Sequence, residues 1–514
     1  MKLNTQSILY GTLVLTAANL FVRLLGFIYR IFLSRKIGPE GMGLFQLVFP
    51  VYTLSITVAA SGIPVAVSRL VAQQKALGNN KGAHQVVLVG VFLVASLSAC
   101  LFAIILFNID FISSNLLHDI RIRLALFIIL PCICITGIAS VLKGYFYGIK
   151  DIHPPAIAEI VEQMIRMILV TFLLTCIPSL NEQTSAAIAA FGMVIGELGG
   201  LLFLHYCYHN NNNGIRKYKS FPQVSILKKI LKIAIPITLT RLITTILGSA
   251  NAVLIPGRLV SSGISRNKAI AIYGILSGMV MPLVFIPFSI ITALSVVIIP
   301  NLSENYALKN WASIRDKISK SILLTSTTAF STMALLIPLG QPLGVVLYKQ
   351  SLAGDLLTPI ALFMIFTCLD YNLGSILNGL GMETRSAIHS TLGDILQLFL
   401  TYFLVGNSYF GIYGFVIGFI LNSIVVSILH FIALIRTTGL KPDFIRWFIK
   451  PGLICLVTAS AVRFLFLMLV YSGIAYSLSL IISATTGMII CITLLICSGQ
   501  IPRLKPFYFV YIRK

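Results

Sequence analysis

Long apolar stretches, separated by short polar ones, follow one another along almost the whole chain. A membrane-spanning helix needs about 20 mostly apolar residues, and most of these stretches reach that length. The run lengths predict about fourteen spans. Their approximate cores are 8–33, 44–67, 86–107, 123–142, 156–178, 186–207, 232–255, 271–299, 321–340, 356–377, 388–405, 411–435, 452–471 and 476–497. The pattern therefore predicts an all-α integral membrane protein.

Charged residues are scarce in this chain and unevenly placed. The sequence is 57% hydrophobic and only 10% charged, whereas a soluble globular protein is about a quarter charged. The net charge of +23 would fit nucleic acid, but most lysines and arginines lie in alternate loops, as the positive-inside rule predicts. The more basic side also carries both ends of the chain. We therefore expect a multi-pass cell-membrane protein with both termini in the cytoplasm and no nucleic-acid partner.

The two halves of the chain resemble each other at three places that occur in the same order. SGIPVAVSRLVAQQKALGN resembles TALSVVIIPNLSENYALKN, SVLKGYFYG resembles SILNGLGME, and FGMVIGE resembles YGFVIGF. The matched positions are Asn79 with Asn310, Gly144 with Gly379, and Gly196 with Gly418. This order predicts a six-plus-six duplication in which both repeats enter from the same side, which favours two pseudo-symmetric six-helix lobes around a central cavity.

The repeat divides the chain into four predicted parts. These are an N-terminal six-helix lobe over 1–210, a cytoplasmic basic linker over 211–231, a C-terminal six-helix lobe over 232–440, and two extra C-terminal transmembrane helices with a basic tail over 441–514. A short amphipathic helix ends the linker, and it can enter the membrane interface while its lysines meet anionic membrane lipids. Its apolar residues are Ile226, Leu227, Ile230 and Leu231, and its lysines are Lys228, Lys229 and Lys232. Alternatively, these bases only set the topology.

Two arginines lie deep inside predicted spans, at matching places in the two halves. Arg23 stands in ANLFVRLL and Arg241 in ITLTRLI. Charged groups at membrane depth are costly and usually line a cavity, and neither arginine has a carboxylate within four residues. Arginine also suits bidentate recognition of phosphate. We therefore predict a chamber that holds an anion, with Asn19 one helical turn before Arg23 on the same face.

Carboxylates inside the spans are candidates for binding a coupling cation. In the fifth span Glu159, Glu162 and Arg166 are spaced three and four apart, so they share one helical face. Asp394 falls close to the repeat-equivalent position of Glu162, and Asp370 opens a polar patch in the tenth span. The candidate acids are thus Glu159, Glu162, Asp370 and Asp394. The alternative is structural: these charges pair with each other between helices and only fix packing, and Glu162 with Arg166 is an obvious local pair.

No enzyme motif stands out in this sequence. A Walker loop, a Rossmann glycine fingerprint and an HExxH motif are all missing. The nine cysteines fall in or beside apolar runs, which is typical of small buried hydrophobes. His205 and His209 are four apart, but no carboxylate ligand lies near them in sequence. We expect no catalysis, no cofactor and no metal site.

Several motifs together resemble a known family. ANLFVRLLGFIYRIFLSRKIGPEGMGLFQLVFPVY, SGIPVAVSRLVAQ and LKGYFYG resemble the stage V sporulation protein B group of polysaccharide exporters. That group belongs to the multidrug/oligosaccharidyl-lipid/polysaccharide (MOP) flippase superfamily. The bacterial lipid II flippases are related and have a similar RxLGF pattern, present here as Arg23, Leu25, Gly26 and Phe27.

The resemblance implies a V-shaped pair of six-helix lobes that works by alternating access. It also implies a lipid-linked substrate, an undecaprenyl-pyrophosphate glycan used as a peptidoglycan precursor in spore cortex synthesis. In the related flippases, arginines of spans 1, 2 and 8 serve the pyrophosphate. Arg23 and Arg69 match by position, but the eighth span has no arginine, and Arg258 and Arg266 precede it. The last two helices would form a groove for the lipid tail, where Arg463 lies.

Two other functions fit the same sequence. A multidrug exporter of the same fold would carry cationic compounds, and that chemistry needs accessible acids in a cavity rather than the arginines of spans 1 and 7. A non-transporting scaffold for cell-wall enzymes would depend on its cytoplasmic loops and not on intramembrane charges. The prediction that we prefer is a flippase with Arg23, Arg69 and Arg241 on the pyrophosphate.

Overall fold

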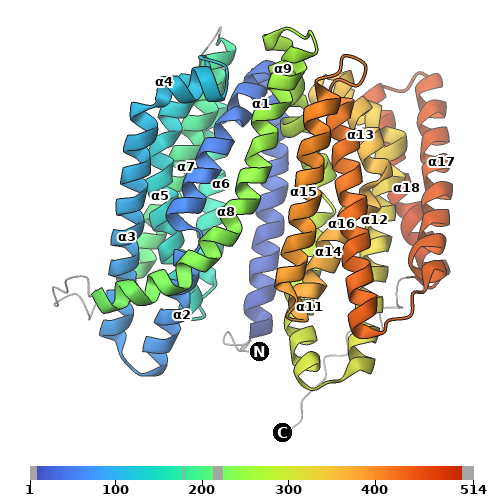
Figure 1. Ribbon diagram of the computed structural model, residues 1–514. Coiled ribbons are helices and arrows are strands. Elements are labelled where there is room, and N and C mark those ends of the chain that lie inside the picture. Colours follow the sequence, from blue (N-terminus) through green and yellow to red (C-terminus); the bar gives the residue numbers. More distant parts are fainter. Residues whose placement is uncertain (1–7, 178–179, 212–223, 501–514) are drawn as a thin grey trace. The chain divides into compact units, whose positions relative to one another are not determined.

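The computed structural model describes residues 8–177, 180–211 and 224–500, with only the backbone described over 8–19 (Figure 1). All regular structure among these residues is helical, as the apolar run lengths predicted. The first half contains α1 (Ile8–Ala60), α2 (Ile63–Ala76), α3 (Asn80–Phe107), α4 (Ile109–Phe111), α5 (Ile122–Gly148), α6 (His153–Cys176), α7 (Glu182–Asn211), α8 (Val224–Ser261) and α9 (Arg266–Gly274). The second half contains α10 (Met281–Val284), α11 (Phe288–Ala307), α12 (Trp311–Tyr348), α13 (Ser351–Leu362), α14 (Met364–Gly379), α15 (Glu383–Val405), α16 (Tyr413–Thr438), α17 (Lys450–Tyr471) and α18 (Tyr476–Cys497).

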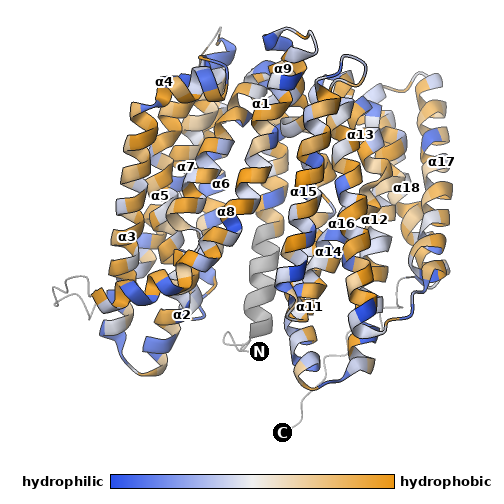
Figure 2. Cartoon of the chain, viewed as in Figure 1, coloured by the Kyte–Doolittle hydropathy of each residue, from blue (hydrophilic) through white to orange (hydrophobic). Residues whose placement is uncertain are grey.

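Hydrophobic residues dominate the helices, and hydrophilic residues are more frequent toward helix ends and loops (Figure 2). Within the described part of the chain, twelve helices are long and apolar enough to cross a membrane, or thirteen if the bent pair α13 and α14 forms one span. This finding confirms a multi-span membrane protein, but it does not confirm the predicted count of fourteen. The count differs at three places, each with a local cause.

The first two predicted spans form one helical stretch in the structure, with a kink at Gly38. The φ of Gly38 is 72°, a left-handed value that glycine adopts without strain, and Pro39 follows it. The predicted span 271–299 is interrupted at Phe285–Pro287, between α10 and α11. Helix α6 is long enough to span, but its three charged residues break the apolar run. Run length alone could not resolve these features.

The contacts divide the chain into two compact units. Unit 1 comprises Met1–Gly278 and Thr401–Ile412, and unit 2 comprises Met279–Leu400 and Tyr413–Lys514. The contacts place α8 and α9 in unit 1, although the sequence repeat assigns them to the second half. The lobe boundaries of the sequence repeat therefore stay a prediction.

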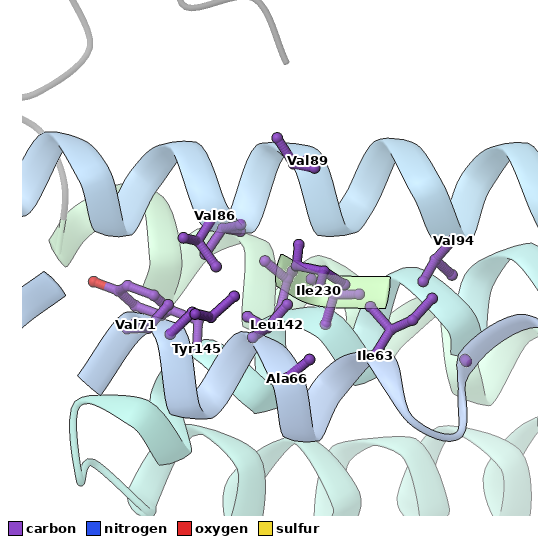
Figure 3. Close-up of a cluster of buried hydrophobic side chains, with 14 of the residues drawn as sticks. Ile63, Ala66, Val71, Val86, Val89, Val94, Leu142, Tyr145 and Ile230 are labelled. Atoms are coloured by element: carbon purple, nitrogen blue, oxygen red, sulfur yellow. The ribbon is translucent and has the colours of Figure 1, made fainter. Parts of the chain in front are cut away.

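A buried hydrophobic cluster in unit 1 explains why the beginning of α8 belongs there (Figure 3). Ile230 of α8 is fully buried among residues of α2, α3 and α5, and Ile226 and Leu227 pack against the same cluster. Lys228 and Lys229, on the other side of the helix, are exposed. The helix is amphipathic as predicted, but its apolar side packs on the protein core instead of the membrane interface.

The structure repeats several details in both halves. Asn79 caps α3 by accepting a hydrogen bond from the Gly82 amide at 2.9 Å, and Asn310 caps α12 by accepting one from the Ser313 amide at 3.1 Å. A methyl group on Gly144 would lie 2.6 Å from the Pro64 carbonyl oxygen of α2. One on Gly379 would lie 3.2 Å from the Ile299 carbonyl oxygen of α11. Pro64 and Ile299 are as far apart in sequence as the two glycines, which supports the predicted register of the repeat.

Candidate functional site

The three predicted pyrophosphate ligands lie on helices of unit 1. Arg23 belongs to α1, Arg69 to α2 and Arg241 to α8, and all three are exposed. Asn19 belongs to α1, but its side chain lies outside the described residues. These three exposed cations thus lie on spanning helices, which is an uncommon placement for charge in a membrane protein.

Arg241 has a backbone partner that the sequence did not reveal. Its Nη1 donates a hydrogen bond to the Ser61 carbonyl oxygen at 3.0 Å. Ser61 lies in the two-residue break between α1 and α2, where the regular helical ladder is interrupted. A guanidinium has five N–H donors, so this bond leaves the others for a ligand.

Hydrogen bonds between hydroxyl groups connect α8 to the same break between α1 and α2. Thr57 and Thr245 share a hydrogen bond of 3.2 Å, and the Ser61 hydroxyl donates to Thr238 at 3.2 Å. Gly62, the next residue, packs directly on the backbone of α8, because a methyl group there would lie 2.2 Å from the Ala234 carbonyl oxygen. Arg241 is therefore held in place by a packed polar seam between α8 and the α1–α2 break.

A second cluster of charges lies within unit 1, between α5, α6 and α7. The Nζ of Lys143 in α5 lies 3.6 Å from Glu159 and 3.8 Å from Glu162, both in α6. The Nη2 of Arg166 in α6 lies 3.6 Å from Glu197 in α7. The expected local pair between Glu162 and Arg166 is therefore wrong, since each residue has its ion-pair partner on another helix. We call these five residues the charged network.

The charged network also has neutral hydrogen-bonding partners. Thr136 of α5 donates to the Glu197 carboxylate at 2.9 Å, and the Tyr52 hydroxyl of α1 lies 3.0 Å from the Thr136 hydroxyl. The predicted acids Glu159 and Glu162 thus belong to a network that reaches four helices. Lys143 was not predicted as their counter-ion, because it lies on the preceding helix, α5, and not at helical spacing from them within α6.

Glycines of α7 allow α6 to come close enough for these contacts. A methyl group on Gly196 would lie 2.8 Å from the Glu162 carbonyl oxygen, and one on Gly200 would lie 3.2 Å from Cγ of Glu162. Gly192, Gly196 and Gly200 are spaced four apart, which is the small-residue pattern that lets membrane helices approach closely. This glycine face fixes Glu162 beside α7.

The other two predicted acids lie in unit 2, in different surroundings. Asp370 of α14 lies 3.3 Å from Nδ1 of His430 in α16, and His430 is only 1% exposed. Asp394 of α15 lies 3.4 Å from the Asn422 amide, which also donates to Gln397 at 2.8 Å. The four predicted acids therefore fall in two separate units. Among the described residues, no three His, Cys, Asp or Glu side chains are grouped as metal ligands.

The packing also identifies the repeat counterpart of Glu162, which the sequence placed close to Asp394. Gly196 packs on the Glu162 carbonyl. Its counterpart Gly418 packs on the Gln397 carbonyl, whose oxygen would lie 3.3 Å from a methyl group added at Gly418. Gln397 is therefore the structural counterpart of Glu162. In that register Asp394 corresponds to Glu159 rather than to Glu162.

A further group of charges joins three helix ends of unit 1, and we call it the clamp. Arg121 contacts Glu40, just after the kink of α1, at 2.5 Å and Asp119 at 2.8 Å. Arg266, at the start of α9, donates to the Leu117 carbonyl oxygen at 2.6 Å. Burial alone would raise the pKa of Asp119, but hydrogen bonds from Arg121 and the charges of Arg121 and Arg266 hold that pKa below its ordinary value.

An apolar pocket of about 350 Å³ lies in unit 2 between α12, α14, α16 and the segment before α17. Its lining includes five phenylalanines: Phe330, Phe366, Phe431, Phe444 and Phe448. Such a pocket offers no hydrogen bond beyond the Ser427 hydroxyl, so it suits a hydrocarbon chain.

The sequence profile of the polysaccharide biosynthesis protein family matches residues 8–306, more than half of the chain. The chain belongs to this family. Among its relatives are "Stage V sporulation protein B" of Bacillus subtilis (strain 168), 28% identical over 83% of either chain, and "Lipid II flippase MurJ" of the same organism, 25% identical over 77% of either chain. The resemblance seen in the sequence motifs is thereby confirmed.

Solved structures show that this member of the polysaccharide biosynthesis family has a MOP transporter fold. The structure of lipid II flippase MurJ in an inward closed conformation matches with a TM-score of 0.72 at 15% identity, covering 95% of this chain and 99% of that one. An inward-facing multidrug resistance MATE family transporter of the MOP superfamily matches with a TM-score of 0.66 at 18% identity, covering 82% and 98%. At these identities the likeness concerns the fold alone.

Proposed function

We propose that this chain is a flippase of an undecaprenyl-pyrophosphate-linked glycan, working by alternating access. The observation that carries the proposal is the set of exposed arginines on spanning helices of unit 1: Arg23, Arg69 and Arg241. Membership of the polysaccharide biosynthesis family, and relatives named as a flippase and a sporulation protein, support the same choice. No enzymatic step is needed.

Arg241 provides the clearest site for the pyrophosphate. The seam with α1 and α2 holds its side chain through the Ser61 carbonyl, so the remaining N–H groups are pre-oriented. A fixed guanidinium forms two parallel hydrogen bonds to a phosphate group and loses little conformational freedom in doing so. Arg23 and Arg69 supply further charge for a substrate that bears several negative charges.

The lipid tail has to remain in apolar surroundings while its headgroup crosses. The phenylalanine pocket of unit 2 is suited to isoprene units, because branched hydrocarbon packs well on aromatic rings and has no polar atom to satisfy. Two of its phenylalanines, Phe444 and Phe448, lie just before α17, one of the helices for which the family resemblance implies a tail groove.

Transport needs an energy source, and the membrane-embedded acids are candidates for a coupling cation. Glu159 and Glu162 in the charged network, or Asp370 and Asp394 in unit 2, would bind it. The membrane potential is an alternative source, because moving one charge across is worth about 2.3 kcal/mol per 100 mV. Removing the potential in vesicles while keeping ion gradients separates the two.

The remaining parts of the proposal concern the membrane and the biological role. Lys228, Lys229 and Lys232 are exposed on α8 and would contact anionic lipids of the cytoplasmic leaflet, with both termini on that side. The glycan that we favour is the peptidoglycan precursor for the spore cortex. The reason is the similarity to "Stage V sporulation protein B", which extends over 83% of this chain.

A flipping assay tests the proposal directly. Reconstituted vesicles would be loaded with a labelled undecaprenyl-pyrophosphate disaccharide, and its exposure to a membrane-impermeant reagent would be followed with time. The double variant Arg23→Ala/Arg241→Ala should lose at least tenfold in rate. Lys320→Ala is a matched control, because Lys320 is an exposed cation paired only with Asp316 one turn away.

Arg241 also braces the α1–α2 break, so its removal needs a second readout. Arg241→Lys keeps a donor for the Ser61 carbonyl but cannot form the bidentate phosphate contact. This variant should fold with the wild-type melting temperature and still flip slowly. Wild-type rates in both variants would exclude the proposed site.

A multidrug exporter remains the second candidate, favoured by the MATE-like fold and by the half-buried acids of α6. Such a protein would move a cationic dye in the same vesicles, and the lipid-linked glycan would not compete. Dye transport that is insensitive to Arg23→Ala/Arg241→Ala would favour this function over the flippase.

A further inference from the structure

A polar groove lies on unit 2 between α12, α13 and α17, apart from the arginines of unit 1 and the phenylalanine pocket. Its volume is about 990 Å³. The polar lining residues are Gln341, Asp355, Thr358, Tyr413, Ser460 and Arg463. Phe464 and Leu467 of α17 form an apolar margin and are themselves exposed, Phe464 to 71%. The groove therefore combines two opposite charges with an apolar border.

Arg463 is held in this groove by a backbone carbonyl of α12 that lacks its usual helical partner. Pro342 has no N–H and cannot bond the carbonyl of the residue four positions earlier, Pro338. Nη1 of Arg463 donates to that Pro338 carbonyl oxygen at 3.3 Å. One bond out of five possible donors leaves most of the guanidinium without a protein partner. Within the described residues, no carboxylate lies within ion-pair distance of it.

Asp355 reaches the groove because α13 packs very closely on α12. A methyl group on Gly354 would lie 2.3 Å from Cα of Gln341, and one on Gly344 would lie 2.5 Å from the Gly354 amide nitrogen. Asp355 follows Gly354 and is exposed. No described cation pairs with it. The glycine contact thus fixes a second uncompensated charge beside Arg463.

Both charges lie nearer the helix end on one predicted side of the membrane, the start of α13 and the end of α17. Asp355 is in the second turn of α13. Arg463 is eight residues before the end of α17 at Tyr471, or about 12 Å at 1.5 Å per residue. By the predicted topology this end faces the outside of the cell. Charges inside spanning helices are costly unless they have a partner, and the groove opens where lipid headgroups lie within reach.

We propose that this groove binds a zwitterionic aminophospholipid, with its phosphate on Arg463 and its ammonium on Asp355. An anionic lipid such as phosphatidylglycerol would satisfy Arg463 but would leave Asp355 without a cation. A headgroup with both charges satisfies both residues, and its acyl chains lie along Phe464 and Leu467. The polar lining separates this site from the phenylalanine pocket, which has no charge to offer.

Native mass spectrometry of the purified full-length chain in detergent can test this assignment. Phosphatidylethanolamine, phosphatidylglycerol and N-acetyl-phosphatidylethanolamine, which lacks the ammonium charge, would be titrated with matched acyl chains. We expect phosphatidylethanolamine to bind about tenfold more tightly than the other two, since only it forms both charge-assisted contacts. Equal binding of all three lipids would overturn the proposal.

Two substitutions assign the contacts to residues. Asp355→Asn should abolish the preference and leave phosphatidylglycerol binding unchanged, because only the ammonium contact is lost. Arg463→Gln should weaken both lipids. Arg463→Lys serves where the Gln variant loses folding, since lysine still donates to the Pro338 carbonyl and keeps the charge. Lys450→Gln, at the other end of α17, is the control. A preference that survives Asp355→Asn would show that the groove is not the site.

Discussion

The same helix packing holds different chemistry in the two halves of the chain. In the first half a glycine face of α7 supports a network of three carboxylates and two cations. In the second half the matching glycine face of α16 supports a cluster of amides. The counterparts are Lys143 and Asn378, Glu159 and Asp394, Glu162 and Gln397, Glu197 and Phe419, and Gly200 and Asn422. The backbone contacts are retained after the duplication, whereas only one charge of the network is retained, the carboxylate shared by Glu159 and Asp394.

The Asn422 side chain shows how the second half replaces the ion pairs. Gly200 has no side chain, and Glu162 packs against it. Asn422 instead fills the space and donates to Gln397 at 2.8 Å. An amide pair needs no counter-ion and has a small desolvation cost. The first half, with partly buried charges that depend on one another, is therefore the half in which loss of one residue should matter most.

Removing the cation of the charged network should have the largest effect. Lys143→Met leaves Glu159 and Glu162 without their cation, and because Glu162 is buried, the loss of its partner costs about 3 kcal/mol. Its counterpart change, Asn378→Leu, removes no ion pair and should cost less than about 1 kcal/mol. Unfolding midpoints in detergent compare the two variants, and equal losses would contradict the difference between the two halves.

The glycine faces should differ by a smaller amount. A methyl group on Gly196 would meet the Glu162 carbonyl at 2.8 Å, whereas one on Gly418 would lie 3.3 Å from the Gln397 carbonyl. We therefore expect Gly196→Ala to destabilise the protein by about 2 kcal/mol through overpacking, and Gly418→Ala by less than half of that. Thermal unfolding of the two single variants measures the difference, and the reverse order would refute it.

The smallest effect concerns acid, and it involves the clamp outside the spans. The folded pKa of Asp119 lies below its unfolded value. Its ionised form therefore contributes stability that is complete above the unfolded pKa of about 3.9 and is lost as the pH falls through the folded pKa. Asp119→Asn has no such group and should show a flatter decline of the melting temperature below about pH 4. Parallel declines in variant and wild type would assign the acid sensitivity to other carboxyls.

Much of the fold follows from the sequence, because spans and repeats are local signals. Run length predicted the helices, and the matched Asn79 and Asn310 do cap corresponding helices. The glycine pairs were found for the same reason, since close helix contacts require small residues at fixed spacing. The kink at Gly38 lies in the polar segment between the first two predicted spans, where run length predicted an interruption and could not show that the helix resumes at once.

The candidate site was less predictable, because its partners come from distant parts of the chain. Spacing within α6 suggested a pair of Glu162 and Arg166, but Lys143 and Glu197 on neighbouring helices took these roles. Arg241 was identified from its depth in the predicted span. Its contact with the Ser61 carbonyl could not be predicted, because Ser61 lies in a helix break 180 residues earlier in the chain. Neither arrangement leaves a signature in one segment.

The bond between Arg241 and the backbone of Ser61 has one last consequence. The guanidinium that ties α8 to the backbone between α1 and α2 is the same group that receives the anion in the proposed function. An incoming anion therefore competes with the Ser61 carbonyl and loosens that joint.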